Sequence, residues 1–362
     1  MESPSSSFAG ARNFVSSGPS ARVLPSGTSG AAVPNVREDV GSRSPASRIA
    51  ALDFTKGALV LIMVFYHWLN YFFRLDGSVY KYLRFLTPSF IFITGLLISH
   101  VYLSQSNVTR ASRRLWLRGV KLLGIVLALN LMMNVLHLSQ LKATFRGGSS
   151  SFLLPLLAGT GPVAFSILAP IGYLLILSAG LLIVSRYYLP VFHLVAAILV
   201  LGALVCEAKG ITGGYLQLLS AGALGASIGY IPMDRINAWT KSAWLLSGAY
   251  LVYLYALTVW DAVYALQIVG VVLSLAVLYW MGNQKRVDIV TRLGRYSLFA
   301  YIVQILILQA LRQAFRGFDA GPALLGMLLA AGILLTIVSV EAVDRARARF
   351  STFNRIYGAV FS

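Results

Sequence analysis

Three ionisable side chains stand at helical spacing in the first long apolar segment of this chain. Asp53 and Lys56 are three residues apart, and His67 follows Lys56 by eleven residues. In a helix, Lys56 and His67 would fall within about 20° of one face and about 16 Å apart along the axis. An imidazole titrates near neutral pH, so it can take a proton from a hydroxyl group and release it again. The stripe therefore predicts proton-transfer chemistry centred on His67.

The same face continues beyond His67 with Asn70 and Tyr71. Charged groups are costly against lipid, which predicts that the stripe faces the interior of a helix bundle and makes it a functional candidate. A structural interpretation stays open beside this one. Asp53 and Lys56 could neutralise each other at the membrane interface, and His67 could be a packing histidine.

The composition requires lipid as the solvent for much of the surface. The 362 residues are 57% hydrophobic and 12% charged, whereas soluble domains have about 25% charged residues. The formal net charge is +18, but the basic residues lie mainly between long apolar runs. That distribution follows the positive-inside rule and argues against a nucleic-acid partner. The lipid bilayer is the predicted partner.

Apolar runs long enough to cross a bilayer organise the chain into an all-α, polytopic transmembrane bundle of about ten spans. Residues 1–48 are rich in Ser, Gly, Pro and Ala and predict a disordered cytoplasmic tail. The transmembrane domain is predicted over 49–343, and a basic cytoplasmic C-terminal tail over 344–362. The predicted spans lie near residues 51–73, 84–104, 115–137, 162–184, 188–207, 214–232, 241–260, 262–282, 294–315 and 321–342.

Basic residues between the spans predict the orientation. They cluster on one side, which should be cytoplasmic, and both termini should lie there. This places the protein in a cytoplasmic (inner) membrane. The first outer loop is an exception to the positive-inside rule, because it contains Arg74, Lys81 and Arg84. The basic residues on the cytoplasmic side are Arg110, Arg113, Arg114, Arg118, Lys285, Arg286, Arg292, Arg345, Arg347 and Arg349.

Polar side chains also recur at helical spacing on two other predicted spans. Such stripes could line a cavity that binds a hydroxylated substrate, although a hydrogen bond between helices is the commoner role for any one of them. Trp68 could stack on a sugar face, and Asn70 extends the stripe of His67. The recurring residues are Asn130, Asn134 and His137 on the third span, and Ser297, Tyr301 and Gln304 on the ninth.

The residues that usually hold metals are too few and too scattered to predict a metal site. The four histidines lie far apart in the sequence and form no His-Glu-x-x-His pattern. The one cysteine, Cys206, cannot form an internal disulfide. We therefore predict no metal and no permanently bound cofactor.

Four stretches together resemble the acyltransferase-3 family, within the wider superfamily of transmembrane acyltransferases. The first is Leu-Asp-x-x-Lys-Gly at 52–57, followed by His67, with Arg48 upstream. The resemblance covers residues 48–342 in helix number and order. The other three stretches are Pro-Ser-Phe-Ile-Phe-Ile-Thr-Gly at 88–95, Arg-x-x-Arg at 110–113, and Leu-Gly-Arg-Tyr-Ser-Leu-Phe-Ala-Tyr at 293–301.

The resemblance implies an enzyme that takes an acyl group from acyl-CoA and transfers it to a hydroxyl group. His67 would act as general base or as a transient acyl carrier, with Lys56 and Asp53 in the same catalytic stripe. The acyl group would be acetyl or, as second choice, succinyl, and the acceptor a glycan or glycolipid. Guanidinium groups suit phosphate oxygens. The donor's phosphates would be bound by Arg110, Arg113, Arg114 and Arg118.

The sequence also departs from the family pattern. Position 56 is Lys where the family usually has Arg, and Gln304 stands where many members have a second histidine. No carboxylate follows His67 closely, so an acidic partner would have to come from Asp261, Glu207 or Asp319. The alternative function is a transporter or exporter of a small polar solute, which would use the same buried polar faces.

Overall fold

In the computed structural model of the chain, helices fill the unit within residues 47–362. The described residues are 49–73, 77–102, 105, 107–136, 165, 167–188, 190–211, 214–260, 263–284, 287–315 and 321–361. The predicted tail at 1–48 lies outside them. Within these ranges the secondary structure is helical, with no strand, which confirms the predicted all-α class.

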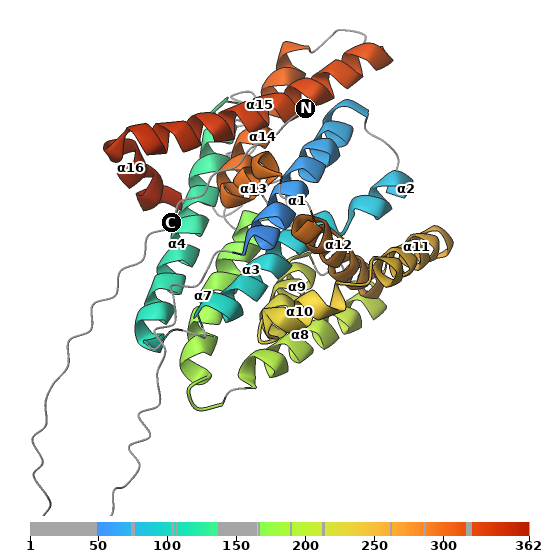
Figure 1. Ribbon diagram of the computed structural model, residues 1–362, viewed down its shortest axis with the longest axis vertical. Coiled ribbons are helices and arrows are strands. Elements are labelled where there is room, and N and C mark those ends of the chain that lie inside the picture. The colour runs from blue at the N-terminus through green and yellow to red at the C-terminus, as the bar shows by residue number, and fades with distance from the viewer. Residues whose placement is uncertain are drawn as a thin grey trace, which may run out of the picture. The chain divides into compact units, whose positions relative to one another are not determined.

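Long apolar helices and a few short ones make up the unit (Figure 1). The π-helical segment η1 continues α1. The 3-10 helix η2 precedes α3. The elements are α1 (Ala50–Trp68), η1 (Leu69–Phe73), α2 (Gly77–Tyr80), η2 (Lys81–Leu83), α3 (Leu86–Tyr102), α4 (Val108–Leu136), α7 (Leu168–Val184), α8 (Val191–Ala208), α9 (Gly214–Ile228), α10 (Met233–Trp239), α11 (Ala243–Val259), α12 (Tyr264–Gln284), α13 (Asp288–Arg295), α14 (Ser297–Ala314), α15 (Pro322–Arg349) and α16 (Ser351–Phe361).

The prediction of ten spans is not confirmed. Among the described residues, seven helices are long and apolar enough to cross a membrane, or eight if the bent pair α9–α10 is one span. That pair turns by 104° between its helices. The helices α7 and α11 have 17 residues each. A helix of that length reaches about 25 Å, which is short of the roughly 30 Å hydrocarbon core.

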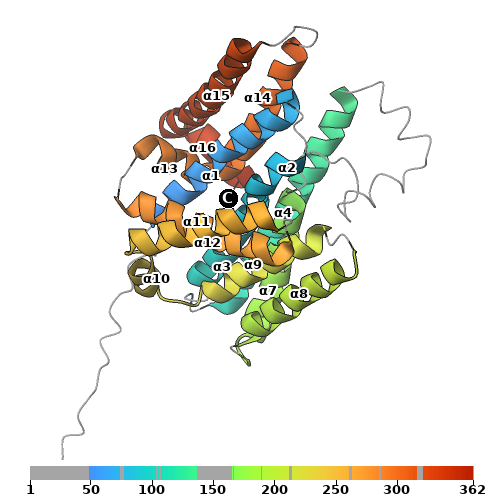
Figure 2. The same cartoon turned by 90° about the vertical axis from the view of Figure 1, so that its right-hand side faces the viewer.

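The helix α1 lies at the centre and packs against α3, α12, α13, α14 and α15 (Figure 2). Its closest approach is to the short helix α13. A Cβ atom added to Gly57 would clash with the carbonyl oxygen of Val290, and one added to Gly294 would clash with that of Asp53. Small residues let transmembrane backbones come this close. The glycines of two family-like stretches therefore form one helix contact.

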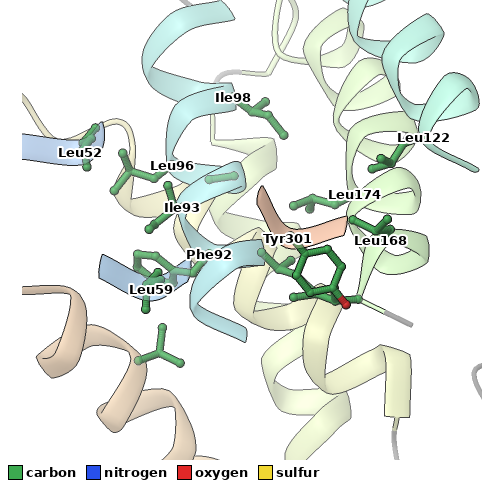
Figure 3. Close-up of a cluster of buried hydrophobic side chains, with 14 of the residues drawn as sticks. Leu52, Leu59, Phe92, Ile93, Leu96, Ile98, Leu122, Leu168, Leu174 and Tyr301 are labelled. Carbon is green, nitrogen blue, oxygen red and sulfur yellow. The ribbon is translucent and has the colours of Figure 1, made fainter. Parts of the chain in front are cut away.

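Glycines also set the contacts of the neighbouring helices. A Cβ on Gly95 of α3 would meet the backbone of Gly222 in α9, and a Cβ on Gly225 would meet Phe92. Gly119 of α4 and Gly172 of α7 face each other in the same way. These contacts bring α3, α4, α7 and α9 together around a common apolar core, part of which is drawn in Figure 3.

The segment predicted as a basic C-terminal tail is helical. The helix α15 continues to Arg349, well past the predicted end of the last span, and α16 follows after Phe350. Arg292 pairs with Glu341 at 2.9 Å, and the hydroxyl of Tyr296 donates to Asp344 at 2.6 Å. These contacts fix the extended end of α15 to the junction of α13 and α14.

Candidate active site

His67 lies near the end of α1, where the helix changes to the π-helical turn η1. Such turns often occur at functional sites because they redirect the side chains that follow. Three tyrosine rings lie around the imidazole. Tyr66 meets it edge-on at 5.3 Å between centroids, Tyr71 of η1 stacks on it at 5.9 Å, and Tyr301 of α14 lies at 6.5 Å.

The Nε2 atom of His67 is buried and has no hydrogen-bond partner within the described part of the chain. A buried polar atom is normally paired, because leaving it unpaired costs roughly 1–3 kcal/mol. Nε2 is therefore free to accept or donate a hydrogen bond to a bound molecule. This is the property that a general base requires.

Gln304 on α14 is a second unpaired polar group. The residue is 0% exposed, and both its amide nitrogen and its amide oxygen lack partners among the described residues. It follows Tyr301 by about one helical turn, and α14 packs against α1. The stripe Ser297, Tyr301 and Gln304 thus runs along α14 into the protein interior, as the spacing predicts.

A cavity of about 430 Å³ approaches this region. Most of its lining is apolar and comes from α3, α4, α7 and α14. Tyr301 forms part of its wall, and Figure 3 shows the Tyr301 ring among Phe92 of α3, Leu122 of α4 and Leu168 of α7. Three cations also line the cavity: Lys56, Arg118 and Lys121.

His67 is not among the residues that line this cavity, and Tyr301 is the lining residue next to it. Lys56 and His67 lie about 16 Å apart along α1. Lys56 lines the cavity, and Tyr301 both lines the cavity and contacts His67. We call the part bounded by Lys56, Arg118 and Lys121 the cation end of the cavity.

Asp53 and Lys56 form an ion pair with 2.6 Å between Oδ1 and Nζ. Asp53 is 7% exposed, and its backbone touches α13 at Gly294. The carboxylate therefore sits near the start of α1, remote from His67. Lys56 reaches the cavity, so it is the member of the pair that could meet a ligand. The catalytic roles predicted for both residues stay predictions.

Only one of the four predicted donor-binding arginines lines the cavity. The guanidinium of Arg118 lies over the Tyr102 ring and donates to the Tyr102 hydroxyl. Arg113 lines a separate apolar groove with Trp116 and Ile183. Arg110 and Arg114 are exposed, and Arg110 lies in the first turn of α4.

Lys121 joins Arg118 at the cation end. It follows Arg118 by three residues on α4, and this spacing already places Arg114, Arg118 and Lys121 on one helix face in the sequence. Tyr66 and Tyr71 are further neighbours of His67, and the position of Tyr71 depends on the π-helical turn η1.

The other predicted substrate-binding residues fall in different places. Trp68 is buried and donates its indole N–H to the carbonyl of Leu325 at 3.1 Å, which places it between α1 and α15. Asn70 is exposed. Asn134 lies on α4, but its side chain and all of His137 are outside the described residues. The same holds for Asp261 and Asp319.

Glu207 is engaged elsewhere. Its carboxylate accepts the backbone N–H of Tyr264 at 2.6 Å, at the first residue of α12. The helix dipole favours a carboxylate at that position. Among the described residues, no group of three or more His, Cys, Asp or Glu side chains gathers to hold a metal ion.

A known protein family matches the region of the chain that holds this site. The family model described as an acyltransferase domain, that of the acyltransferase-3 family, matches residues 49–341. The match covers most of the chain, so the chain belongs to the acyltransferase-3 family and is a multi-pass membrane acyltransferase. The predicted resemblance is confirmed. Comparisons with curated proteins and with solved structures found no match for this chain.

Proposed function

We propose that the protein O-acylates a glycan or glycolipid, taking an acetyl group, or as second choice a succinyl group, from acyl-CoA. One observation carries this proposal. A buried imidazole with an unpaired Nε2 lies against Tyr301, and Tyr301 forms the wall of a cavity lined by three cations. The cavity thus offers positive charge for a phosphorylated donor, and the imidazole that would serve as base lies behind its Tyr301 wall.

The donor would lie along the cavity. Its phosphates would meet Arg118, Lys121 and Lys56, since charge-assisted hydrogen bonds to phosphate are the strong ones. Its long pantetheine arm would follow the cavity toward Tyr301. Arg110, Arg113 and Arg114 would then act at longer range, by raising the local concentration of an anionic donor.

The chemical step would use His67 as general base. Nε2 takes the proton of the acceptor hydroxyl while the hydroxyl oxygen attacks the thioester carbonyl. The carbon–sulfur bond then breaks, the new ester forms, and the imidazole returns its proton to the thiolate of CoA. The amide nitrogen of Gln304 is a candidate donor to the oxyanion that develops on the carbonyl. His67 as a transient acyl carrier is the variant of this scheme.

The acceptor would reach His67 from the side opposite the cation end. Asn70, Asn134 and His137 are the candidate contacts there, with Trp68 as an apolar neighbour. The proposed orientation has both termini in the cytoplasm of a cytoplasmic (inner) membrane. It is supported by the basic residues at the start of α4 and the end of α15.

The test is thioester cleavage by purified, detergent-solubilised protein. Acetyl-CoA is supplied with and without a candidate sugar acceptor, and released CoA is measured. We expect turnover that falls roughly 10²- to 10⁴-fold in His67→Ala, the usual contribution of a general base. The control His193→Ala alters an exposed histidine on α8 and should keep full turnover.

Other outcomes would contradict the proposal. Unchanged turnover in His67→Ala would remove His67 from the mechanism. If well-folded protein neither binds nor cleaves short acyl-CoAs, acyl-CoA is not the donor. Flux of a small polar solute into liposomes without any acyl donor would instead favour the transporter alternative.

A further inference from the structure

The C-terminal helix α16 lies beyond the residues that the family model matches, which end at 341. It follows α15 after a single residue, Phe350, whose backbone is extended (φ −119°, ψ 112°). This sharp reversal turns α16 back from the end of α15 toward α4 (Figure 1).

The last turn of α16 forms part of the cavity wall. Val360 and Phe361 line the cavity together with the three cations. The Phe361 ring lies 6.0 Å from that of Phe299 on α14. On the other side, Nζ of Lys121 on α4 donates to the carbonyl oxygen of Ala359 at 3.0 Å. The last turn therefore bridges α4 and α14 across the cation end.

The rest of α16 is held mainly by Tyr357, whose ring meets those of Tyr296 at 5.6 Å and Phe299 at 6.4 Å between centroids, and by Arg347. The guanidinium of Arg347 lies 4.6 Å from the centroid of the Tyr357 ring and 5.4 Å from that of Tyr296. Its Nε donates to Oδ1 of Asn354 at 2.9 Å. Arg347 thus binds the π face of the Tyr357 ring. No residue of α16 is fully buried.

Lys121 is the link between α16 and a ligand. The carbonyl groups at a helix C-terminus carry a partial negative charge, so the end of α16 gives Lys121 a weak anionic partner. A phosphate group is a stronger partner for an ammonium group. An anionic donor that enters the cation end would therefore compete with Ala359 for Lys121.

We propose that α16 is a movable wall of the donor cavity, which closes the cation end through Lys121 and is displaced by the phosphorylated head group of the acyl donor. The displacement by donor rests on the function proposed above. The movable wall rests on the contacts of α16 alone. In this arrangement Arg347 is a positioning residue, because it reaches the cavity through Tyr357, Asn354 and Tyr296 and does not line it.

The mobility of α16 can be tested without any acyl donor, by measuring how fast a thiol reagent enters the cavity. The chain has one cysteine, so Cys206→Ser gives a background for Ser297→Cys, a reporter on the cavity lining. The labelling rate with a small, charged, membrane-impermeant thiol reagent is then measured. Arg347→Ala should raise it roughly three- to tenfold, the factor expected for loss of a cation–π contact.

Two further variants make the test specific. Phe361→Ala should raise the rate as well, because it removes the aromatic contact with Phe299. Arg355→Ala removes one positive charge, as Arg347→Ala does, but from an exposed position on α16. It should leave the labelling rate unchanged. Melting temperatures in detergent check that each variant is folded. Equal labelling rates in all four proteins would overturn the proposal.

Acetyl-CoA then separates this proposal from the function on which it rests. For this test the Cys206→Ser background carries Gly358→Cys instead of Ser297→Cys, with Arg347 intact, and a spin label is attached at position 358. Saturating acetyl-CoA should raise the mobility of this label. If labelling rises in Arg347→Ala but unaltered protein neither binds nor cleaves acetyl-CoA, the wall stands and the proposed function fails. If acetyl-CoA turns over while α16 stays immobile, displacement by donor is refuted.

Discussion

The ring of Tyr301 lies 6.5 Å from the imidazole of His67 and also forms part of the wall of the cavity that Lys56, Arg118 and Lys121 line. This one tyrosine therefore stands between the buried base and the space where a donor would bind. Gln304, one turn further along α14, adds an unpaired amide to the same region. Tyr301 and Gln304 thus lie on one face of α14, the helix that packs against α1.

Gln304→Leu should separate stability from activity. The native amide is 0% exposed and unpaired, and such a group costs roughly 1–3 kcal/mol relative to an apolar side chain of similar shape. We expect the melting temperature in detergent to rise. Turnover should fall by about 10²-fold if the amide stabilises an oxyanion. Circular dichroism melting and CoA release measure the two effects.

The matched control is Gln313→Leu, which makes the same change at an exposed position on α14. It should alter neither quantity. Unchanged turnover in Gln304→Leu, together with a higher melting temperature, would reduce the amide to a packing residue and remove it from the proposed site.

Gly57→Ala should prevent the native contact between α1 and α13. The added Cβ would clash with the backbone carbonyl of Val290, which cannot move as a side chain can. Overpacking of this kind costs about 1–3 kcal/mol and sometimes more. We therefore expect a lower melting temperature and less monodisperse protein on size-exclusion chromatography.

Gly124→Ala provides the comparison on α4, because nothing lies within 4 Å of a Cβ added there. Alanine is the better helix former by up to about 1 kcal/mol, so this variant should be as stable as the native protein or more so. A Gly57→Ala protein as stable as the Gly124→Ala protein would contradict the described packing.

Helical periodicity was enough to predict the polar stripe of α14 and the common face of Lys56 and His67. Both depend only on a regular rise and turn per residue. Every predicted span contains a helix, but hydropathy averages over breaks. The window 214–232 therefore includes Pro232, where the chain bends between α9 and α10. The mean hydropathy of the window does not change at a single residue such as Pro232, so it cannot show where the chain bends.

The positions of Tyr71 and Phe361 could not be predicted from helical periodicity. Tyr71 stacks on His67 from within the π-helical η1, and the sequence carries no general signal for that change of helix type. Phe361 reaches the cavity only because α16 folds back after Phe350. Its segment is too short and too polar for the criterion that identifies a span, so charge alone suggested a tail.

Arg118→Gln should raise KM for acyl-CoA more than Arg113→Gln does. Arg118 lines the cavity, whereas Arg113 lines a separate groove. Loss of one partly exposed phosphate contact is worth roughly a tenfold change in KM, once solvent screening is allowed for. Raising the salt concentration should shrink the difference between Arg118→Gln and the native protein, because added ions screen the interaction. Initial rates at two salt concentrations give the comparison.

An equal rise in KM for both arginine variants would show that only the overall positive field matters. No rise in either variant would exclude this cavity as the donor site. Both outcomes can be read without knowledge of the acceptor if the basal hydrolysis of acyl-CoA is followed.

Asp53→Asn should destabilise the protein by removing the carboxylate that pairs with Lys56 at 2.6 Å. Both side chains are largely buried, with 10% and 19% of their surface exposed. Breaking a buried pair typically costs about 3–5 kcal/mol, because the remaining charge is left without its partner. The partial exposure of Lys56 places the expected loss at the lower end of that range. Thermal denaturation in detergent measures it.

The double variant Asp53→Asn/Lys56→Met decides between the two interpretations of this pair. Removing both charges should restore most of the lost stability, because no unpaired ammonium group remains. If Lys56 also contacts the donor, KM for acyl-CoA stays raised in the stable double variant. Native KM and native stability together would make the pair a structural link between α1 and its surroundings, and would leave Arg118 and Lys121 as the cations of the donor site.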